Sequence, residues 1–183
     1  MMEDVKIKFI DECYNEAIEL KEGFKKTENK EWNIMTVLLE LGVQIGHIFD
    51  IKCNNSDVKE PMRNINNLGD EISDVLLQTM YLGYLEDVDF KKNIDFKYSE
   101  IDGIVALYGQ LVETVMEEES YRFKKERVGF ESRLDFINDR ILRIYLLTIN
   151  YAIECNIDVI TEFKKMKDNA EEFLKNYEEK YRM

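Results

Sequence analysis

The chain has 183 residues, of which 45% are hydrophobic and 34% are charged, a usual globular balance that excludes disorder of the whole chain. Its formal net charge of −13 repels a polyphosphate backbone, so a DNA or RNA polymer is excluded as a partner. A small anion remains compatible with this charge, because it can arrive together with Mg²⁺.

Helical periodicity runs through the sequence from end to end. Apolar residues recur at spacings of three and four, and only one proline and eight glycines interrupt them. The first predicted helix is marked by apolar residues at 9–20 and runs out at about 23–29, and the second is marked at 34–49 and ends near 50–57. The third lies at about 67–85, and the fourth is marked at 104–115 and runs into the charged stretch 116–127. The fifth is marked at 136–151, and the sixth lies at about 159–181. The segment 54–61, with the only proline, is predicted as a loop, and residues 86–98 as a polar joint. Strand-like alternation is missing, so we expect a single all-α domain over residues 1–183.

The beginning of the chain and its cysteines bear on location. Residues 1–24 carry charges throughout and do not read as a signal peptide, and no stretch approaches the roughly 18 uncharged apolar residues of a transmembrane helix. The three cysteines are irregularly spaced and the sequence has one histidine, which argues against a disulfide framework and a zinc site. We expect a cytoplasmic protein with reduced thiols and no membrane contact.

The two halves of the sequence resemble each other at a constant offset of 69 residues. When residues 68–90 are laid over 137–159, several positions are identical and most apolar positions meet apolar ones. The identical pairs are Asp70 and Asp139, Ile72 and Ile141, Leu77 and Leu146, Thr79 and Thr148, and Asp89 and Asp158. Any two amphipathic helices can align this well, but the agreement continues beyond the helix. We predict a bundle of two diverged helical repeats, at about 32–90 and 101–180.

A pair of acidic residues marks the third predicted helix. Glu71 and Asp74 are three residues apart, so they lie on one helix face about a turn apart, inside an otherwise apolar run. Two carboxylates in this arrangement can share a hard divalent cation. The alternative is a solvated helix face, which the same spacing also produces.

The second predicted helix carries a matching polar stripe. Glu40, Gln44 and His47 recur at spacings of four and three on a helix otherwise made of Leu, Val and Ile. Because both helices are mostly apolar, they must pack together, and their polar residues avoid an uncompensated burial cost by meeting one another or a cation. We therefore expect the acidic pair of the third helix to face Glu40 and Gln44. For His47, a neutral hydrogen-bonded core histidine is favoured over a ligand.

These motifs resemble those of the MazG-like all-α nucleoside triphosphate pyrophosphohydrolases, near the dCTP pyrophosphatases and the dimeric dUTPases. The resemblance covers about residues 32–175 and is carried by a tryptophan-bearing segment, the ExxD helix NLGDEISDVLLQTMYLG and the closing segment 156–173. The family's first acidic motif, ExxE, is altered here. If Glu40 is its first acid, the second position is Val43, and in the other register the two acids become Leu41 and Gln44.

The resemblance implies a MazG-like helical bundle that hydrolyses a nucleoside or deoxynucleoside triphosphate to the monophosphate and pyrophosphate. It implies Mg²⁺ as cofactor, with Mn²⁺ as a substitute, and a homodimer, although an internal duplication could satisfy the same interface within one chain. The implied metal ligands are Glu40, Gln44, Glu71 and Asp74, and the implied catalytic residues are Glu40, Glu71 and Asp74. The implied substrate-binding residues are Trp32, Gln44, Lys165, Lys167 and Asn169.

A second interpretation stays open, because Val43 and Gln44 leave the metal site one anionic ligand short. This favours a catalytically degenerate protein of the same fold, which serves as a nucleotide sensor or an interaction module. The intact pair Glu71 and Asp74 argues for the enzyme.

The second repeat is predicted to be structural. Arg140 and Arg143 stand where the first repeat has its ExxD acids, and Glu113 and Glu117 lie on the helix before them. The arginines are expected either to form salt bridges with carboxylates where a metal would otherwise sit, or to form ordinary surface ion pairs.

Overall fold

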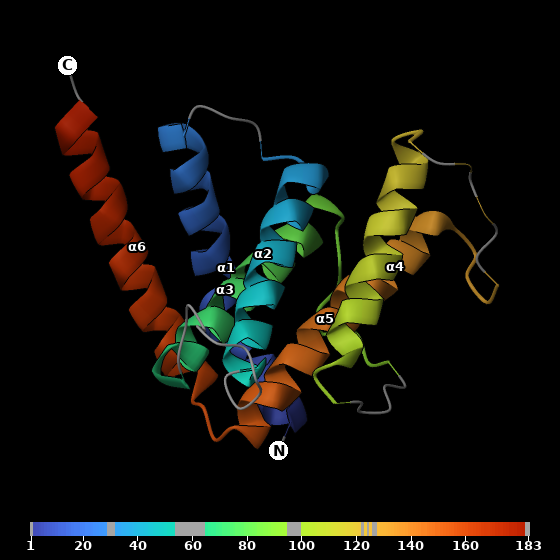
Figure 1. The fold of residues 1–183 in the computed structure, drawn as a ribbon, viewed down its shortest axis with the longest axis horizontal. Helices are drawn as coiled ribbons and strands as arrows, with labels where there is room; N and C mark the ends of the chain where they lie inside the picture. The colour runs from blue at the N-terminus through green and yellow to red at the C-terminus, as the bar shows by residue number, and fades with distance from the viewer. Residues whose placement is uncertain are drawn as a thin grey trace.

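The computed structural model describes residues 2–28, 32–53, 65–94, 100–121, 123, 125 and 128–181. Within these ranges the chain forms helices and no strand, which confirms the all-α prediction (Figure 1). The elements are α1 (Met2–Glu28), α2 (Ile34–Cys53), the 3-10 helix η1 (Ile65–Asn67), α3 (Leu68–Leu85), α4 (Gly103–Glu118), α5 (Arg133–Glu154) and α6 (Val159–Tyr181). The predicted loop 54–61 lies outside the described residues.

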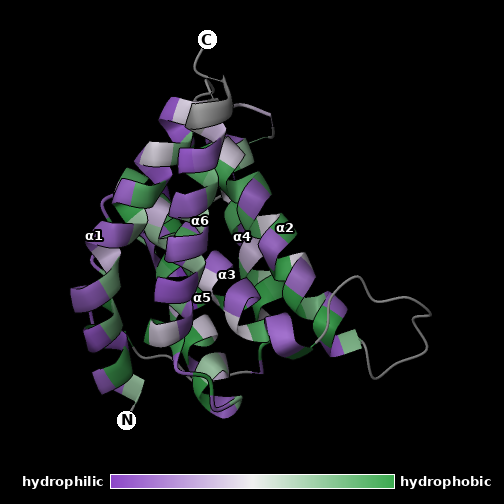
Figure 2. Cartoon of the chain, turned by 90° about the vertical axis from the view of Figure 1, so that its left-hand side faces the viewer, coloured by the Kyte–Doolittle hydropathy of each residue, from purple (hydrophilic) through white to green (hydrophobic). Residues whose placement is uncertain are grey.

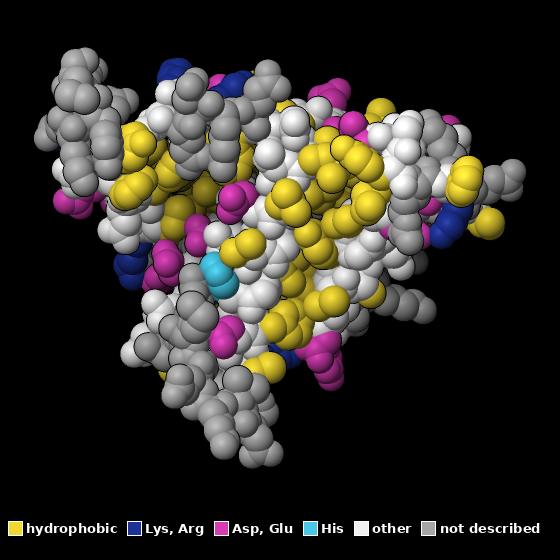
Figure 3. Space-filling model, turned by 45° about the horizontal axis from the view of Figure 1, so that its top comes forward, with side chains coloured by type: hydrophobic (Ala, Val, Ile, Leu, Met, Phe, Trp, Pro, Cys, Tyr) yellow, Lys and Arg dark blue, Asp and Glu magenta, His cyan; other side chains and the backbone are white. Residues whose placement is uncertain are grey.

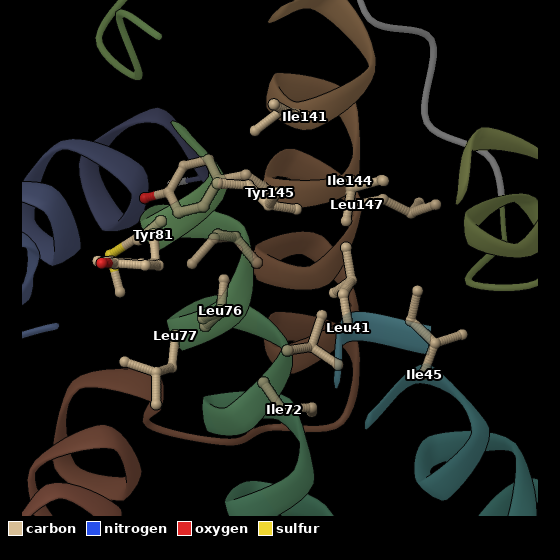
Figure 4. Packing of buried hydrophobic residues seen from close by; sticks show 14 of the residues in the cluster. Leu41, Ile45, Ile72, Leu76, Leu77, Tyr81, Ile141, Ile144, Tyr145 and Leu147 are labelled. Atoms are coloured by element: carbon tan, nitrogen blue, oxygen red, sulfur yellow. The ribbon is translucent and has the colours of Figure 1, made fainter. Parts of the chain in front are cut away.

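The helix α3 lies at the centre of the bundle, where it contacts α1, α2, α5 and α6. Every residue from 71 to 83 is buried except Asp74. Figure 4 shows the apolar side chains of α2, α3 and α5 meeting around this helix. Each fully buried leucine or isoleucine there contributes about 1.5–3 kcal/mol relative to an exposed one. A helix buried on almost all sides can carry polar residues only where a partner or a cavity meets them.

The helices α1 and α6 run side by side and in the same direction (Figure 1). Their polar residues form ion pairs along the contact, between Lys164 and Glu12 at 2.9 Å and between Lys167 and Glu16 at 3.6 Å. Figure 2 shows the hydrophilic outer side of α6. Because exposed ion pairs contribute only about 0–1 kcal/mol each, the apolar inner stripes of the two helices hold this pair in place.

The helix α2 is strongly apolar along its length. By length and composition alone it is the one described helix that could cross a membrane, with a mean hydropathy of 1.5 over 18 residues, of which 33% are buried. A core helix passes the same test, and α2 packs against α3 and α4. Its outer side leaves Leu39 and Val43 65% and 50% exposed. Figure 3 shows apolar side chains gathered on the face that carries the histidine.

The two halves of the fold match at the predicted offset. α2 begins at residue 34 and α4 at 103, and α3 ends at 85 and α5 at 154, so these two differences are 69 residues. The inner bounds depart from the offset, because α2 ends at 53 and α4 at 118, and α3 begins at 68 and α5 at 133. After α3 and α5 the chain turns through Asp87 and Asn156, with left-handed φ values of 55° and 56°. The corresponding hydrogen bonds run from Val88 N–H to Gly83 O at 2.8 Å and from Ile157 N–H to Ala152 O at 2.9 Å.

This turn is a common way to end a helix, and Asp and Asn tolerate the left-handed conformation better than most residues. Its occurrence at both helix ends supports the repeat hypothesis. The full superposition of residues 32–90 on 101–159 is predicted to bring α2 onto α4 and α3 onto α5. Helix pairs that cross in opposite senses in the two halves would contradict it.

The three cysteines give a test of the packing. Cys13 is buried, Cys155 is half-buried and Cys53 is exposed. Burial raises the pKa of the Cys13 thiol to about 12, so almost no thiolate is present at pH 8. We expect a thiol reagent to label Cys53 first and Cys13 only after unfolding, measured by mass spectrometry of the peptides. Early labelling of Cys13 in the folded protein would contradict the position of α1.

Candidate functional site

A cavity of about 370 Å³ is lined by residues of α1, α2, α3 and α6 and of the segment before α2. Five residues that the sequence singled out line it: Trp32, Glu40, Gln44, Asp74 and Asn169. The other lining residues are Lys21, Phe24, Asp70, Leu77, Gln78, Met166 and Ala170. Residues far apart in the sequence therefore meet here, and α2 and α3 bring most of the polar ones.

One wall of the cavity is a stripe along α3. Asp70, Asp74 and Gln78 follow one another at intervals of four residues, which keeps them on the same side of the helix. From Asp70 to Gln78 this stripe extends about 12 Å, at 1.5 Å per residue. Asp70 lies in the first turn of α3, where the helix dipole favours a negative charge. The carboxylates thus occupy one end of the stripe and the carboxamide the other.

Glu71 points to a different neighbour. Its side chain is 4% exposed, and its Oε2 lies 2.9 Å from Nδ1 of His47, while Oε1 of Gln44 lies 2.7 Å from the same nitrogen. Both neighbours of this nitrogen are oxygens that accept, so Nδ1 carries a proton and donates to them. Glu71 is not among the residues that line the cavity. His47 is hydrogen-bonded as expected, but its side chain is 24% exposed and therefore does not belong to the core.

A buried lysine forms part of the cavity wall near the tryptophan. Lys21 is 1% exposed, and its ammonium nitrogen lies 3.4 Å from the centroid of the Trp32 ring and 5.7 Å from that of Tyr81. A cation over an aromatic face is attracted by the electron density of the ring. The hydroxyl of Tyr81 donates to Glu22 at 2.7 Å, and burial raises the pKa of this tyrosine.

Sequence reasoning missed Lys21, although a signal was present. Phe9, Cys13 and Ala17 mark the apolar stripe of α1 at intervals of four residues, and Lys21 is the next position in that series. A charged residue at an apolar position of a helix, like Glu40 on α2, is a candidate for a buried polar site. Gln78 was missed in the same way, because it continues the spacing of four from Asp74 on a helix that is buried on almost all sides.

The two lysines of α6 that were predicted to bind the substrate lie outside the cavity. The side chain of Lys165 is 63% exposed and pairs with Glu162 at 2.7 Å. Lys167 lies between Glu16 and Glu171, at 3.6 Å and 3.5 Å. Neither lysine lines the cavity, whereas Asn169 of the same helix does. Of the three residues predicted on α6, only the asparagine faces the site.

The acids of the cavity are not gathered into a metal cage. Among the described residues, no group of three or more His, Cys, Asp or Glu side chains lies close enough to hold a metal ion. The chemistry of the donors nevertheless suits a hard cation, because Glu40, Asp70, Asp74 and the carboxamide of Gln44 offer only oxygen ligands.

Comparisons of the chain with protein-family models, curated proteins and solved structures found no match. The MazG-like resemblance therefore stays a prediction, and the function has to be argued from the cavity itself.

The second half differs at the positions that correspond to the ExxD acids. Arg140 and Arg143 both pair with Asp139, at 2.9 Å and 2.7 Å. The two glutamates predicted as possible partners of these arginines also form ion pairs. Glu113 pairs with Lys125 at 2.6 Å, and Glu117 pairs with a third arginine, Arg133. Arginine–carboxylate pairs thus occupy this region, with Asp139 from the same helix as the shared partner.

Proposed function

We propose that the cavity binds a nucleoside or deoxynucleoside triphosphate with Mg²⁺, and that the protein hydrolyses it to the monophosphate and pyrophosphate. The observation that carries the proposal is the meeting of Glu40, Gln44 and Asp74 with Trp32 in one cavity, from separate parts of the sequence. Its volume of about 370 Å³ lies in the range of small-molecule sites.

The charge of the cavity supports a requirement for a cation. Three carboxylates, Glu40, Asp70 and Asp74, face one ammonium group, that of Lys21, so a bare triphosphate would be repelled. These acids and Gln44 would hold a hard divalent cation, which would neutralise phosphate charge and lower the pKa of a bound water.

Trp32 would bind the base, and Glu40 would accept the proton of the attacking water. Trp32 borders the cavity with the ammonium of Lys21 over one face of its ring, so a base would lie beside this lysine–tryptophan pair. Glu40 comes from α2 and the other two acids come from α3, so it approaches the phosphates from a different helix. A carboxylate in that position can accept the proton that the attacking water loses. We assign this role to Glu40. Asp70 and Asp74 would hold the cation, which in turn would orient the phosphates.

The test is a screen of common ribo- and deoxyribonucleoside triphosphates with Mg²⁺ or Mn²⁺, assayed separately for pyrophosphate and orthophosphate. We expect pyrophosphate to be released from at least one of them, and only in the presence of the cation. Release of orthophosphate, or no release from any nucleotide with either metal, would contradict the proposed reaction.

A second candidate, a nucleotide sensor without turnover, is favoured by a specific observation. No metal cage is formed among the described residues, and Glu71 is directed to His47. Trp32 is the only tryptophan of the sequence and lines the cavity, so its fluorescence reports binding directly. Saturable quenching by a nucleotide that is never cleaved would support the sensor in place of the enzyme.

A further inference from the structure

Gln78 has an unusual position in the wall of the cavity. Its side chain is 5% exposed, and its Oε1 is buried and receives no hydrogen bond from any of the residues that the structure describes. The great majority of buried polar atoms in folded proteins have a partner. A buried carbonyl oxygen that borders a cavity and lacks a donor is therefore a place where a ligand can supply one.

Gln78 lies near aromatic side chains, and this position indicates which part of a ligand it would contact. Tyr81 follows Gln78 by about one helical turn, and Lys21 lies between the rings of Tyr81 and Trp32, 5.7 Å and 3.4 Å from their centroids. Gln78 and Trp32 are thus at the same end of the cavity. The acids of α3 lie at the other end, since Asp74 precedes Gln78 by one turn and Asp70 precedes it by two.

The α3 wall of the cavity therefore runs from the carboxylates of Asp70 and Asp74 to the carboxamide of Gln78, while Glu40 lines the α2 wall. A nucleoside triphosphate has the same polarity, with phosphates and their cation at one end and a flat, hydrogen-bonding base at the other. Phosphates held with their cation at Asp70 and Asp74 would place the base toward Gln78 and Trp32.

We propose that Gln78 is the residue that recognises the nucleobase: its Oε1 accepts a hydrogen bond from a ring N–H or amino group of a base that lies against Trp32. This proposal rests on the nucleotide-binding function argued above. It adds the orientation of the ligand and a residue that contributes to the choice of base. It also explains why a polar side chain is retained on the most buried helix of the fold.

The experiment measures binding through the fluorescence of Trp32, with Mg²⁺ and αβ-methylene nucleoside triphosphates, which cannot be cleaved at that bond. The matching base-free compound, αβ-methylene ribose 5-triphosphate, is titrated in parallel. Gln78→Met keeps the length and approximate volume of the side chain and removes the acceptor. Gln78→Glu restores an acceptor oxygen at the same place. Gln110→Met is the matched control, because Gln110 is exposed on α4 and does not line the cavity.

We expect Gln78→Met to weaken binding of the preferred nucleotide about tenfold, the effect of one lost hydrogen bond, and to leave binding of the base-free compound unchanged. Gln78→Glu should bind the nucleotide more tightly than Gln78→Met does, and Gln110→Met should behave like the unmodified protein. Without ligand, Gln78→Met should melt at the same or a higher temperature, because it removes a buried oxygen that lacks a donor.

Several outcomes would overturn the assignment. Equal losses for the nucleotide and the base-free compound would mean that Gln78 serves the sugar, the phosphates or the fold, and a lowered melting temperature would also indicate a structural role. Unchanged nucleotide binding by Gln78→Met would exclude the hydrogen bond. If the unmodified protein binds neither compound, the nucleotide site itself is refuted, whereas binding without pyrophosphate release refutes only the hydrolysis.

Discussion

Replacing Asp74 with asparagine is expected to lower metal-dependent pyrophosphate release by about a hundredfold or more, the size of effect seen when a group that stabilises developing charge is removed. Asp74 is the only residue between positions 71 and 83 that is not buried, and it lines the cavity together with Glu40 of α2. The substitution keeps the shape of the side chain, so the helix content and the melting temperature of the free protein should change little.

The same loss is expected for Glu40→Gln, because both carboxylates border the cavity. Asp168→Asn is the matched control, since Asp168 is an exposed acid of α6 outside the cavity. A nucleotide with Mg²⁺ should raise the melting temperature of the unmodified protein, as a ligand at 100 times its Kd stabilises the folded state by about 2.7 kcal/mol. Turnover that survives both substitutions would place the reaction outside this cavity.

The helices could be predicted because the apolar spacing that defines them is local. α1, α2 and α3 bury the residues whose spacing of three and four first indicated helices, for example Phe9, Leu41 and Ile72. The loop at 54–61 does not enter this comparison, because it lies outside the described residues. The start of α1 at Met2 was missed, although Met2 and Val5 continue its stripe and pack against the core.

The site was predictable only in part, because spacing gives the side of a helix and not the direction of a side chain. Asp70, Asp74 and Gln78 are about 40° apart around α3, while Glu71 lies about 60° from Asp74, at the edge of the stripe that faces α2. There its flexible side chain meets His47. The spacing of residues in the sequence does not determine whether the Glu71 carboxylate contacts His47 or lines the cavity.

The positions of the lysines of α6 could not be predicted from their spacing either. A helix rich in Lys and Glu offers many equivalent pairings, and the packing of α6 on α1 decides that Lys167 lies near Glu16. The outward position of Lys165 follows from the same packing. Asn169 lines the cavity together with Met166 and Ala170 of the same helix.

Glu71 and Asp74 are expected to differ sharply in their effect on stability, although the sequence presents them as one motif. Glu71→Ala should lower the free energy of unfolding by about 2–3 kcal/mol, because it opens a void on a buried helix and removes the acceptor that faces Nδ1 of His47. For a chain of this length, that loss corresponds to a fall in melting temperature of about 5–10 °C. Asp74→Ala should cost less than about 1 kcal/mol, since the side chain is only partly buried at the edge of a cavity.

Urea unfolding of the two alanine variants measures this difference, and Glu71→Gln provides the control. The glutamine keeps the volume and an oxygen that can accept from His47, so most of the stability should return. A double-mutant cycle with His47→Ala should then show that the losses at positions 47 and 71 are not additive, because the two side chains share one hydrogen bond. If Glu71→Ala leaves stability unchanged while abolishing nucleotide binding, Glu71 acts in the cavity after all, and its contact with His47 is secondary.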